Sequence, residues 1–261
     1  MTVRSAAVLG EALPLVLVHG IGADGRMFDP VVERLAGAAH IVVWNLPGYG
    51  GKPLAGPLDF PGLAAALTAD LDALGIERAV LLGHSIGGMV VQELAATFPE
   101  RVRALILSAT TAVFGSRDGS FQREFVQARL GPLDAGQSMA RMAAEVSARL
   151  LGSAAAPGAA PALAGLMSEV PEATFRAAVA CLVTFNRCAE LERIAVPTLM
   201  IAGEEDTNAP LKAMTRMAEV VVGSRLEVLS RTGHLAPLEC PDRYAEIVRR
   251  FLAELPAEGG A

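Results

Sequence analysis

The sequence predicts an α/β fold with a mostly parallel central sheet flanked by helices. Short continuous apolar runs take turns with segments of helical spacing along most of the chain. Continuous apolar strands separated by helices are typical of a parallel sheet that is covered on both faces. The length of 261 residues and the hydrophobic content of 52% fit one large core with room for an insertion.

The first part of the chain supplies four strands and three helices in alternation. A Pro/Gly-rich loop over residues 47–61 separates the second strand from the second helix. The apolar runs predict strands at 15–18, 41–44, 79–82 and 104–107, and the helical spacing predicts helices at 30–35, 63–74 and 88–96.

After Ser108 the alternation stops. Residues 112–190 show no strand pattern but several helical stretches, which are broken at Gly131-Pro132 and across the Ala/Gly/Pro-rich piece 152–165. We therefore expect residues 112–190 to form a helical cap, inserted after the strand that ends near Leu107. The piece 152–165 has little side chain to pack, so it is either a hinge that lets the cap open or a plain surface loop.

The alternation resumes in the last part of the chain. Apolar runs predict strands at 196–202 and 225–229, and helices are expected at 210–221 and 241–255. A sheet that is interrupted once by a helical block predicts an α/β core, formed by residues 1–111 and 191–261, with the cap at 112–190.

Composition excludes several classes of partner. The net charge is −6, and the chain has no run of basic residues of the kind that binds nucleic acid. It also has no uninterrupted stretch of about eighteen apolar residues, which a membrane-spanning helix would need. The segment 1–13 has one arginine and no long apolar core, so a cytoplasmic protein is expected. The 3 cysteines form no C-x-x-C motif and the 4 histidines are far apart, so we expect free thiols and no metal or cofactor.

A candidate nucleophile lies in Gly83-His84-Ser85-Ile86-Gly87, between an apolar run and a helix-like stretch. A short buried strand that enters a helix through a serine flanked by glycines is a nucleophile elbow. The serine adopts a strained backbone, and the glycines let the strand and the helix approach. The helix behind Ser85 directs N–H groups and its positive dipole end toward the site, which favours a negatively charged oxygen.

A serine nucleophile needs a base, and the chain has 4 histidines to supply it. His40 opens a strand, His84 is too near Ser85 in sequence to fold back onto it, and His19 closes the first strand beside an expected oxyanion loop. His234 follows the strand 225–229, at the carboxyl edge of the sheet where ligands bind in open α/β sheets. His234 is therefore the predicted base.

The base in turn needs an acid that holds its tautomer and stabilises the imidazolium. Glu204, Glu205 and Asp206 directly follow the predicted strand 196–202, whereas no acid follows the strand 104–107 until Asp118. The acid is therefore expected in the turn after the strand 196–202.

With these residues the chain resembles the α/β-hydrolases over nearly its whole length. Residues 17–22 resemble the oxyanion loop of that family, 83–88 its nucleophile elbow, 98–102 the end of the helix behind the elbow, and 233–241 the histidine loop and the start of the last helix.

The segment 203–210 resembles the acid turn of the family, in which a glycine and a proline frame an aspartate. This resemblance selects Asp206 over Glu205, and it gives the chain order Ser85, Asp206, His234 that is expected of the fold. Asn45 departs from the pattern, because an aspartate is more usual there. The departure is expected to alter hydrogen bonding at the rim of the site and to leave the triad unchanged.

The resemblance implies that His234 takes the Ser85 proton and that Ser85 attacks a carbonyl, with the oxyanion held by the backbone N–H groups of Ile21 and Ile86. Water then hydrolyses the acyl-enzyme. The elbow helix, the acid turn and the short cap are most similar to 3-oxoadipate enol-lactonases and related small-molecule esterases, although such lactonases often lack the His19-Gly20 pair seen in this chain.

The predicted partner is a small, largely apolar ester or lactone, and a homodimer is left open. Apolar side chains of the cap segment are candidates to line its pocket, although packing within the cap would explain many of them. These candidates are Phe114, Phe121, Phe125, Met139 and Met142, with Phe175 and Phe185 as further members.

Two other functions use the same fold. Hydrolases of C–C bonds in ring-cleavage products share a tryptophan and an arginine near the pocket, but the single tryptophan here, Trp44, lies on a predicted core strand. Some members act as small-molecule receptors with little turnover, and a complete triad disfavours that function. A serine at the elbow argues against dehalogenases and epoxide hydrolases, which use an aspartate there.

Overall fold

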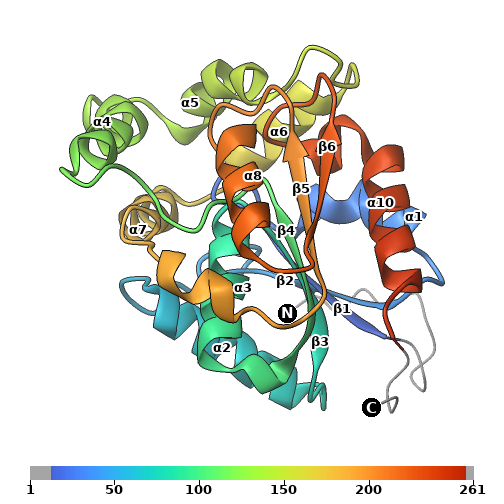
Figure 1. Ribbon diagram of the computed structural model, residues 1–261. Coiled ribbons are helices and arrows are strands. Elements are labelled where there is room, and N and C mark those ends of the chain that lie inside the picture. The colour runs from blue at the N-terminus through green and yellow to red at the C-terminus, as the bar shows by residue number, and fades with distance from the viewer. Residues whose placement is uncertain (1–12, 257–261) are drawn as a thin grey trace.

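The computed structural model describes residues 13–256, and its centre is a six-stranded sheet in the order β2-β1-β3-β4-β5-β6 (Figure 1). Every pair of neighbouring strands is parallel. The strands are β1 (Pro14–Val18), β2 (His40–Trp44), β3 (Ala79–His84), β4 (Val102–Ser108), β5 (Thr198–Gly203) and β6 (Arg225–Leu229). The predicted α/β fold with a parallel sheet is confirmed.

Helices pack on both faces of the sheet. One apolar layer contains α2 (Phe60–Ala73), α3 (Ile86–Thr97) and α8 (Leu211–Val220), and the opposite layer contains α1 (Asp29–Arg34) and α10 (Pro241–Ala253). Side chains of β3 alternate between these layers, since Leu81 belongs to the first and Leu82 to the second. This two-sided burial explains why the central strands are continuous apolar runs. Short helical turns complete the core, namely η1 (Gly25–Phe28), η2 (Pro99–Arg101) and α9 (Ala236–Glu239).

The chain between β4 and β5 is helical and adds no strand to the sheet. It contains α4 (Ser120–Asp134), α5 (Met139–Val146), η3 (Ser147–Leu150), α6 (Ala159–Ser168), α7 (Glu172–Leu182) and η4 (Cys188–Arg193). In Figure 1, α4, α5 and α6 lie beyond the carboxyl ends of the strands. The loops that follow β3, β5 and β6 leave the sheet at the same edge.

The piece 152–165 is partly an exposed turn region and partly helical. Its first part is fastened to the chain after β6. The Gly152 N–H donates to the carboxylate of Glu239, in α9, over 2.7 Å, and the Ala154 N–H donates to the Arg231 carbonyl over 3.1 Å. Its last part belongs to α6. Small residues allow this path, because a side chain at Gly152 would lie 2.4 Å from the Arg231 carbonyl oxygen. The first part of the piece is therefore an exposed turn region attached to the chain after β6, and an opening of the cap there stays a prediction.

Among the described residues, no helix is both long enough and apolar enough to cross a membrane. Residues 1–12, which form most of the segment that the cytoplasmic prediction used, lie outside the described residues.

Candidate active site

Ser85 stands on a sharp turn between β3 and α3. Its backbone has φ 56° and ψ −122°, a region that side-chain-bearing residues seldom occupy. Glycines make this turn feasible, because a Cβ at Gly83 would lie 2.3 Å from the Gly87 carbonyl oxygen and one at Gly87 would lie 2.2 Å from the Val18 carbonyl oxygen. The chain therefore tolerates only glycine at both places, as the sequence pattern indicates.

The structure brings Ser85, His234 and Asp206 together from three separate loops. The Ser85 Oγ lies 3.1 Å from His234 Nε2, and His234 Nδ1 lies 2.8 Å from Asp206 Oδ2. Because a carboxylate only accepts hydrogen bonds, Nδ1 carries the proton that it donates to Asp206. The lone pair on Nε2 then faces the serine hydroxyl, which is the tautomer needed to remove the hydroxyl proton.

The turn after β5 separates Asp206 from Glu205. Burial by itself raises the pKa of Asp206, but the adjacent His234 and the backbone N–H groups of Ala209 and Asn208 lower that pKa below its usual value. Glu205 points away and accepts hydrogen bonds from the Ser153 N–H and hydroxyl. Of these two acids, only Asp206 contacts the histidine.

Sequence reasoning missed Glu239, which holds the loop that carries His234. The Glu239 side chain is buried and its carboxylate accepts hydrogen bonds from the backbone N–H groups of Gly152, Gly233 and Leu235, at 2.7, 2.9 and 2.9 Å. Gly233 and Leu235 flank the histidine, so both sides of it are anchored to one carboxylate. The motif 233–241 contained this residue, but nothing in the sequence showed that its carboxylate folds back.

The other histidines have different surroundings. The Nδ1 of buried His19 lies 2.8 Å from the Gly20 carbonyl oxygen, and its Nε2 accepts the Leu46 N–H, so both ring nitrogens are engaged with backbone. Burial lowers the pKa of His19 to about 4, which keeps the ring neutral. His84 is buried beside Ser108 and its pKa is also lowered by burial. His40 lies at the start of β2.

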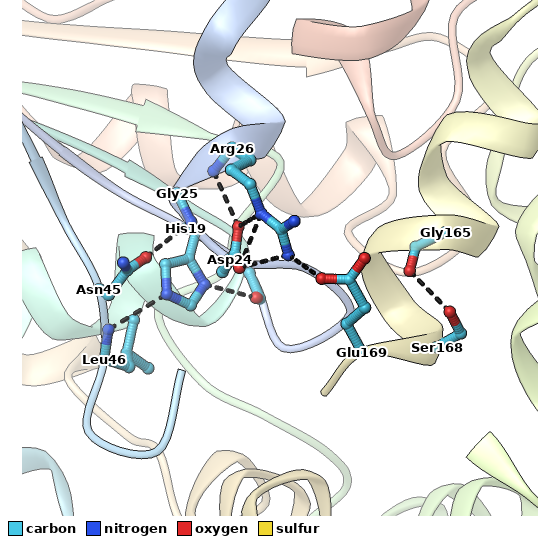
Figure 2. A network of polar contacts seen from close by, with 10 residues as sticks. His19, Asp24, Gly25, Arg26, Asn45, Leu46, Gly165, Ser168 and Glu169 are labelled. Atoms are coloured by element: carbon cyan, nitrogen blue, oxygen red, sulfur yellow. Dashed lines mark hydrogen bonds and ion pairs between the residues drawn. The ribbon is translucent and has the colours of Figure 1, made fainter. Parts of the chain in front are cut away.

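A network of hydrogen bonds and ion pairs braces the loop after β1, as Figure 2 shows. Asn45 accepts the Gly25 N–H over 2.7 Å, so the amide that replaces the usual aspartate braces this loop. Asp24 accepts hydrogen bonds from Arg26, and Arg26 also reaches Glu169, at the end of α6, over 2.6 Å. The loop is thereby tied to the helical segment as well as to the core.

This loop and the start of α3 present the two predicted oxyanion donors. Ile86 is the first residue of α3, where a helical N–H has no partner within its own helix. Ile21 lies in the turn after β1 and lines the cavity next to Ser85. A side chain at Gly20 would come within 3.2 Å of the Ser85 Cβ, which shows how closely this loop approaches the serine.

Comparison with known proteins agrees with this geometry. The model of the alpha/beta hydrolase family matches residues 15–247, which is most of the chain. The chain belongs to the alpha/beta hydrolase family. A pimeloyl-[acyl-carrier protein] methyl ester esterase of Aeromonas hydrophila is 30% identical, over 93% of this hydrolase and 96% of that protein.

Two solved structures illustrate the likeness of the fold. A thermophilic esterase from Thermogutta terrifontis, with malate bound, has a TM-score of 0.84 and 27% identity, and the match covers 95% of this hydrolase and 92% of that chain. An enol-lactonase from Burkholderia xenovorans has a TM-score of 0.83 and 24% identity, covering 94% and 93%. The predicted resemblance to esterases of this family is confirmed, and the esterase relative supports a hydrolase of ester type. The likeness to the enol-lactonase is one of fold.

A cavity opens beside Ser85 and His234, and most of its walls are apolar. It is lined by Phe114, Phe121, Phe125 and Met142 of the predicted set, and by Phe175. Met139, in the first turn of α5, was predicted as a substrate contact but is absent from this lining. Phe185 is also absent from the lining and packs against Phe60, with ring centroids 4.6 Å apart.

Sequence reasoning also missed polar members of the lining. Arg129 of α4 and Asn208 of the acid turn both face the cavity. Trp44 does not line it, and its indole N–H donates to Asp70 of α2 over 2.7 Å. No group of three or more His, Cys, Asp or Glu side chains within residues 13–256 is placed to hold a metal ion.

Proposed function

We propose that this alpha/beta hydrolase is a serine esterase that works through an acyl-enzyme, with Ser85 as nucleophile, His234 as base and Asp206 as orienting acid. One observation carries the proposal: hydrogen bonds connect Ser85 Oγ through His234 to Asp206, and Ser85 and His234 line an apolar cavity. The same chemistry would open a lactone, which is a cyclic ester. The Aeromonas relative is named as a methyl ester esterase, which supports an ester substrate.

In the acylation step, His234 Nε2 removes the Ser85 hydroxyl proton while Oγ forms a bond to the carbonyl carbon. The carbonyl π electrons move to the oxygen, and the N–H groups of Ile21 and Ile86 stabilise the resulting oxyanion. When the oxyanion collapses, the bond to the leaving oxygen breaks and His234 returns its proton to that oxygen. Asp206 stabilises the imidazolium during both transfers.

Deacylation repeats these steps with water as the nucleophile. His234 removes a proton from water, the hydroxide oxygen bonds to the acyl carbon, and the tetrahedral intermediate collapses. The bond to Ser85 Oγ breaks, and His234 returns the proton to the serine. The reaction therefore needs no group beyond the three side chains, the oxyanion donors and water.

The helical segment 112–190 is proposed to act as the cap that selects the substrate. Its side chains supply much of the cavity wall, including Phe114, Phe121, Phe125 and Met142. A wall of this kind favours a small substrate with an apolar chain or ring, because burial of apolar surface stabilises its binding. A cytoplasmic location and a homodimer stay predictions.

Steady-state hydrolysis of p-nitrophenyl esters of increasing acyl length, together with small lactones, tests the proposal. Ser85→Ala is expected to lower kcat by roughly a millionfold for every substrate. Ser224→Ala, which changes a serine between α8 and β6, is the matched control and is expected to retain turnover. A fluorophosphonate probe should label Ser85 in the wild type, as mass spectrometry of the labelled peptide would show.

The same experiment separates the alternatives. A receptor of this fold would be labelled at Ser85 but would not turn over any ester. A C–C bond hydrolase would turn over a ring-cleavage dienoic acid faster than esters. Turnover that persists in Ser85→Ala would show that the proposed nucleophile is wrong.

A further inference from the structure

The cavity beside Ser85 contains one permanently charged side chain. Arg129 projects from α4 and lines the cavity together with Phe125 and Met142, and it is half-buried. An arginine stays charged under nearly all conditions, so this group brings a positive charge into a mostly apolar wall.

The protein itself supplies only a neutral partner for this charge. An Nη2 N–H of Arg129 donates to Asn208 Oδ1 over 3.1 Å, and the guanidinium lies 5.1 Å from the centre of the Phe125 ring. A guanidinium has five N–H donors. Within residues 13–256, no further protein acceptor and no carboxylate pairs with Arg129.

Other arginines of the chain show the contrast. Arg187, which also joins the helical segment to the core, forms two hydrogen bonds of 2.6 Å with Glu93. Arg26 pairs with Asp24 and Glu169. Burial lowers the pKa of Arg129 and no nearby acid opposes this effect. A partly buried charge without a counter-ion is unfavourable unless a ligand provides the missing charge.

Asn208 aims the guanidinium and belongs to the acid turn. Its backbone N–H donates to Asp206 Oδ1 over 2.8 Å, while its side-chain oxygen accepts from Arg129. The turn that orients the acid therefore also positions the cation. The guanidinium also lies over the Phe125 ring, 5.1 Å from its centre, and a planar guanidinium binds a carboxylate through two parallel N–H groups.

We propose that Arg129, positioned by Asn208, binds a carboxylate of the substrate, so that the substrate is an ester with an apolar chain and an anionic group away from the scissile bond. The proposal rests on the esterase function above and names its substrate class. Arg129 is then a specificity-determining residue, since its contact does not involve the reacting carbonyl.

Paired substrates test this assignment. Monomethyl esters of linear dicarboxylic acids are compared with their neutral dimethyl esters, and acetate esters of ω-hydroxy acids with the acetates of the corresponding hydroxy-acid methyl esters, with acid release followed by pH-stat. Arg129→Gln is expected to lower kcat/KM for the anionic member by about ten- to a hundredfold and to change the neutral member by less than about threefold. Arg129→Lys, which keeps the charge but not the planar fork, should recover part of the loss.

The matched control is Arg123→Gln, since Arg123 is exposed on the same helix and does not line the cavity. Arg123→Gln is expected to leave both members of each pair unchanged. Thermal unfolding should show that Arg129→Gln is at least as stable as the wild type, whereas a purely structural arginine would lower the midpoint. Equal loss for anionic and neutral esters, or no wild-type preference for the anionic member in either series, would overturn the proposal.

Binding without turnover separates this proposal from the esterase function. Adipate binding to Ser85→Ala is measured by calorimetry and compared with the Ser85→Ala, Arg129→Gln double variant. Weaker binding in the double variant supports the carboxylate site even if no ester is hydrolysed, an outcome that would contradict only the esterase function. Equal binding in both variants contradicts the carboxylate site, whatever the esterase activity.

Discussion

The loops at the carboxyl ends of the strands and the helical segment 112–190 meet at one cavity but are built differently. On the loop side, buried polar groups such as Asp206 and Glu239 have several short hydrogen bonds each, and the turns depend on glycine. On the helical side, the lining is formed mostly of Phe and Met, with Arg129 as the charged exception. The comparison suggests that the loops fix the chemistry and that the helices select the substrate.

The largest effect on activity is expected from a substitution on the loop side. Asp206→Asn is expected to lower kcat by a factor on the order of ten thousand for all substrates, because an amide no longer fixes the histidine tautomer or stabilises its charge. Steady-state kinetics on neutral and anionic esters should show the same factor for both. A loss confined to one class would mean that this loop also selects substrates.

Glu205→Gln is the matched control for that variant. Glu205 is adjacent in sequence but exposed, and its carboxylate contacts Ser153 rather than His234. Its change is expected to alter kcat by less than about threefold. An equal loss in both variants would contradict the distinct roles given to these neighbouring acids.

A glycine substitution tests the same contrast through stability. Gly83→Ala places a methyl group 2.3 Å from the Gly87 carbonyl oxygen and is expected to lower the free energy of unfolding by about 3 kcal/mol or more, because backbone rather than a flexible side chain must move. Urea denaturation gives the value.

The helical segment supplies the opposite case. Gly165 lies inside α6 and has no atom within 4 Å of an added Cβ. Gly165→Ala is expected to raise the free energy of unfolding by about 0.5–1 kcal/mol, since alanine is the better helix former. If Gly83→Ala and Gly165→Ala changed the free energy of unfolding with the same sign, the two regions would not differ in backbone constraint.

The two regions also differ in how well the sequence predicts them. The strands of the core and the elbow are local features: an apolar run of a few residues, followed by glycines around Ser85, determines the turn within one stretch of chain. The carboxyl ends of parallel strands share one edge, so strand order placed His234 and the acidic turn 204–206 at the site. The choice of Asp206 within that turn needed the family resemblance.

The lining could not be predicted in the same way. Which face of a cap helix meets the cavity depends on the rotation and packing of the helix. Of the two buried methionines on α5, Met142 lines the cavity and Met139 does not. Arg129 and Asn208 are 79 residues apart in sequence, and no local pattern joins them. Glu239 accepts hydrogen bonds from backbone N–H groups. Almost every residue has such a group, so residue types cannot predict these contacts.

The free energy of unfolding is expected to depend on pH through His19, a buried residue of the loop side. The unfolded pKa of His19 is near its usual 6.5, and burial lowers the folded value to about 4, so the folded state resists protonation. Its contribution is therefore complete above about pH 6.5 and is lost as the pH falls toward 4, up to about 3 kcal/mol. His19→Gln should flatten the fall in unfolding free energy between these pH values.

Urea denaturation across this pH range measures the effect, and the values at pH 8 serve as its internal control. There His19 is neutral in both states, so any difference between His19→Gln and the wild type reports lost hydrogen bonds to Gly20 and Leu46 alone. An unchanged slope at lower pH would show that His19 does not carry this dependence. His84 remains in the variant and accounts for part of the residual slope, because burial lowers its pKa as well.

A further test concerns the residue that fastens the two regions together. Glu239→Gln places an amide N–H against one of the three backbone N–H groups that the carboxylate accepts, and should lower the free energy of unfolding by about 1–3 kcal/mol. The exposed Glu246→Gln on α10 is the control, with an expected change within about 0.5 kcal/mol. Hydrogen exchange should accelerate at both Gly152 and Gly233. Acceleration at Gly233 alone would mean that Glu239 positions the histidine loop without holding the helical segment to it.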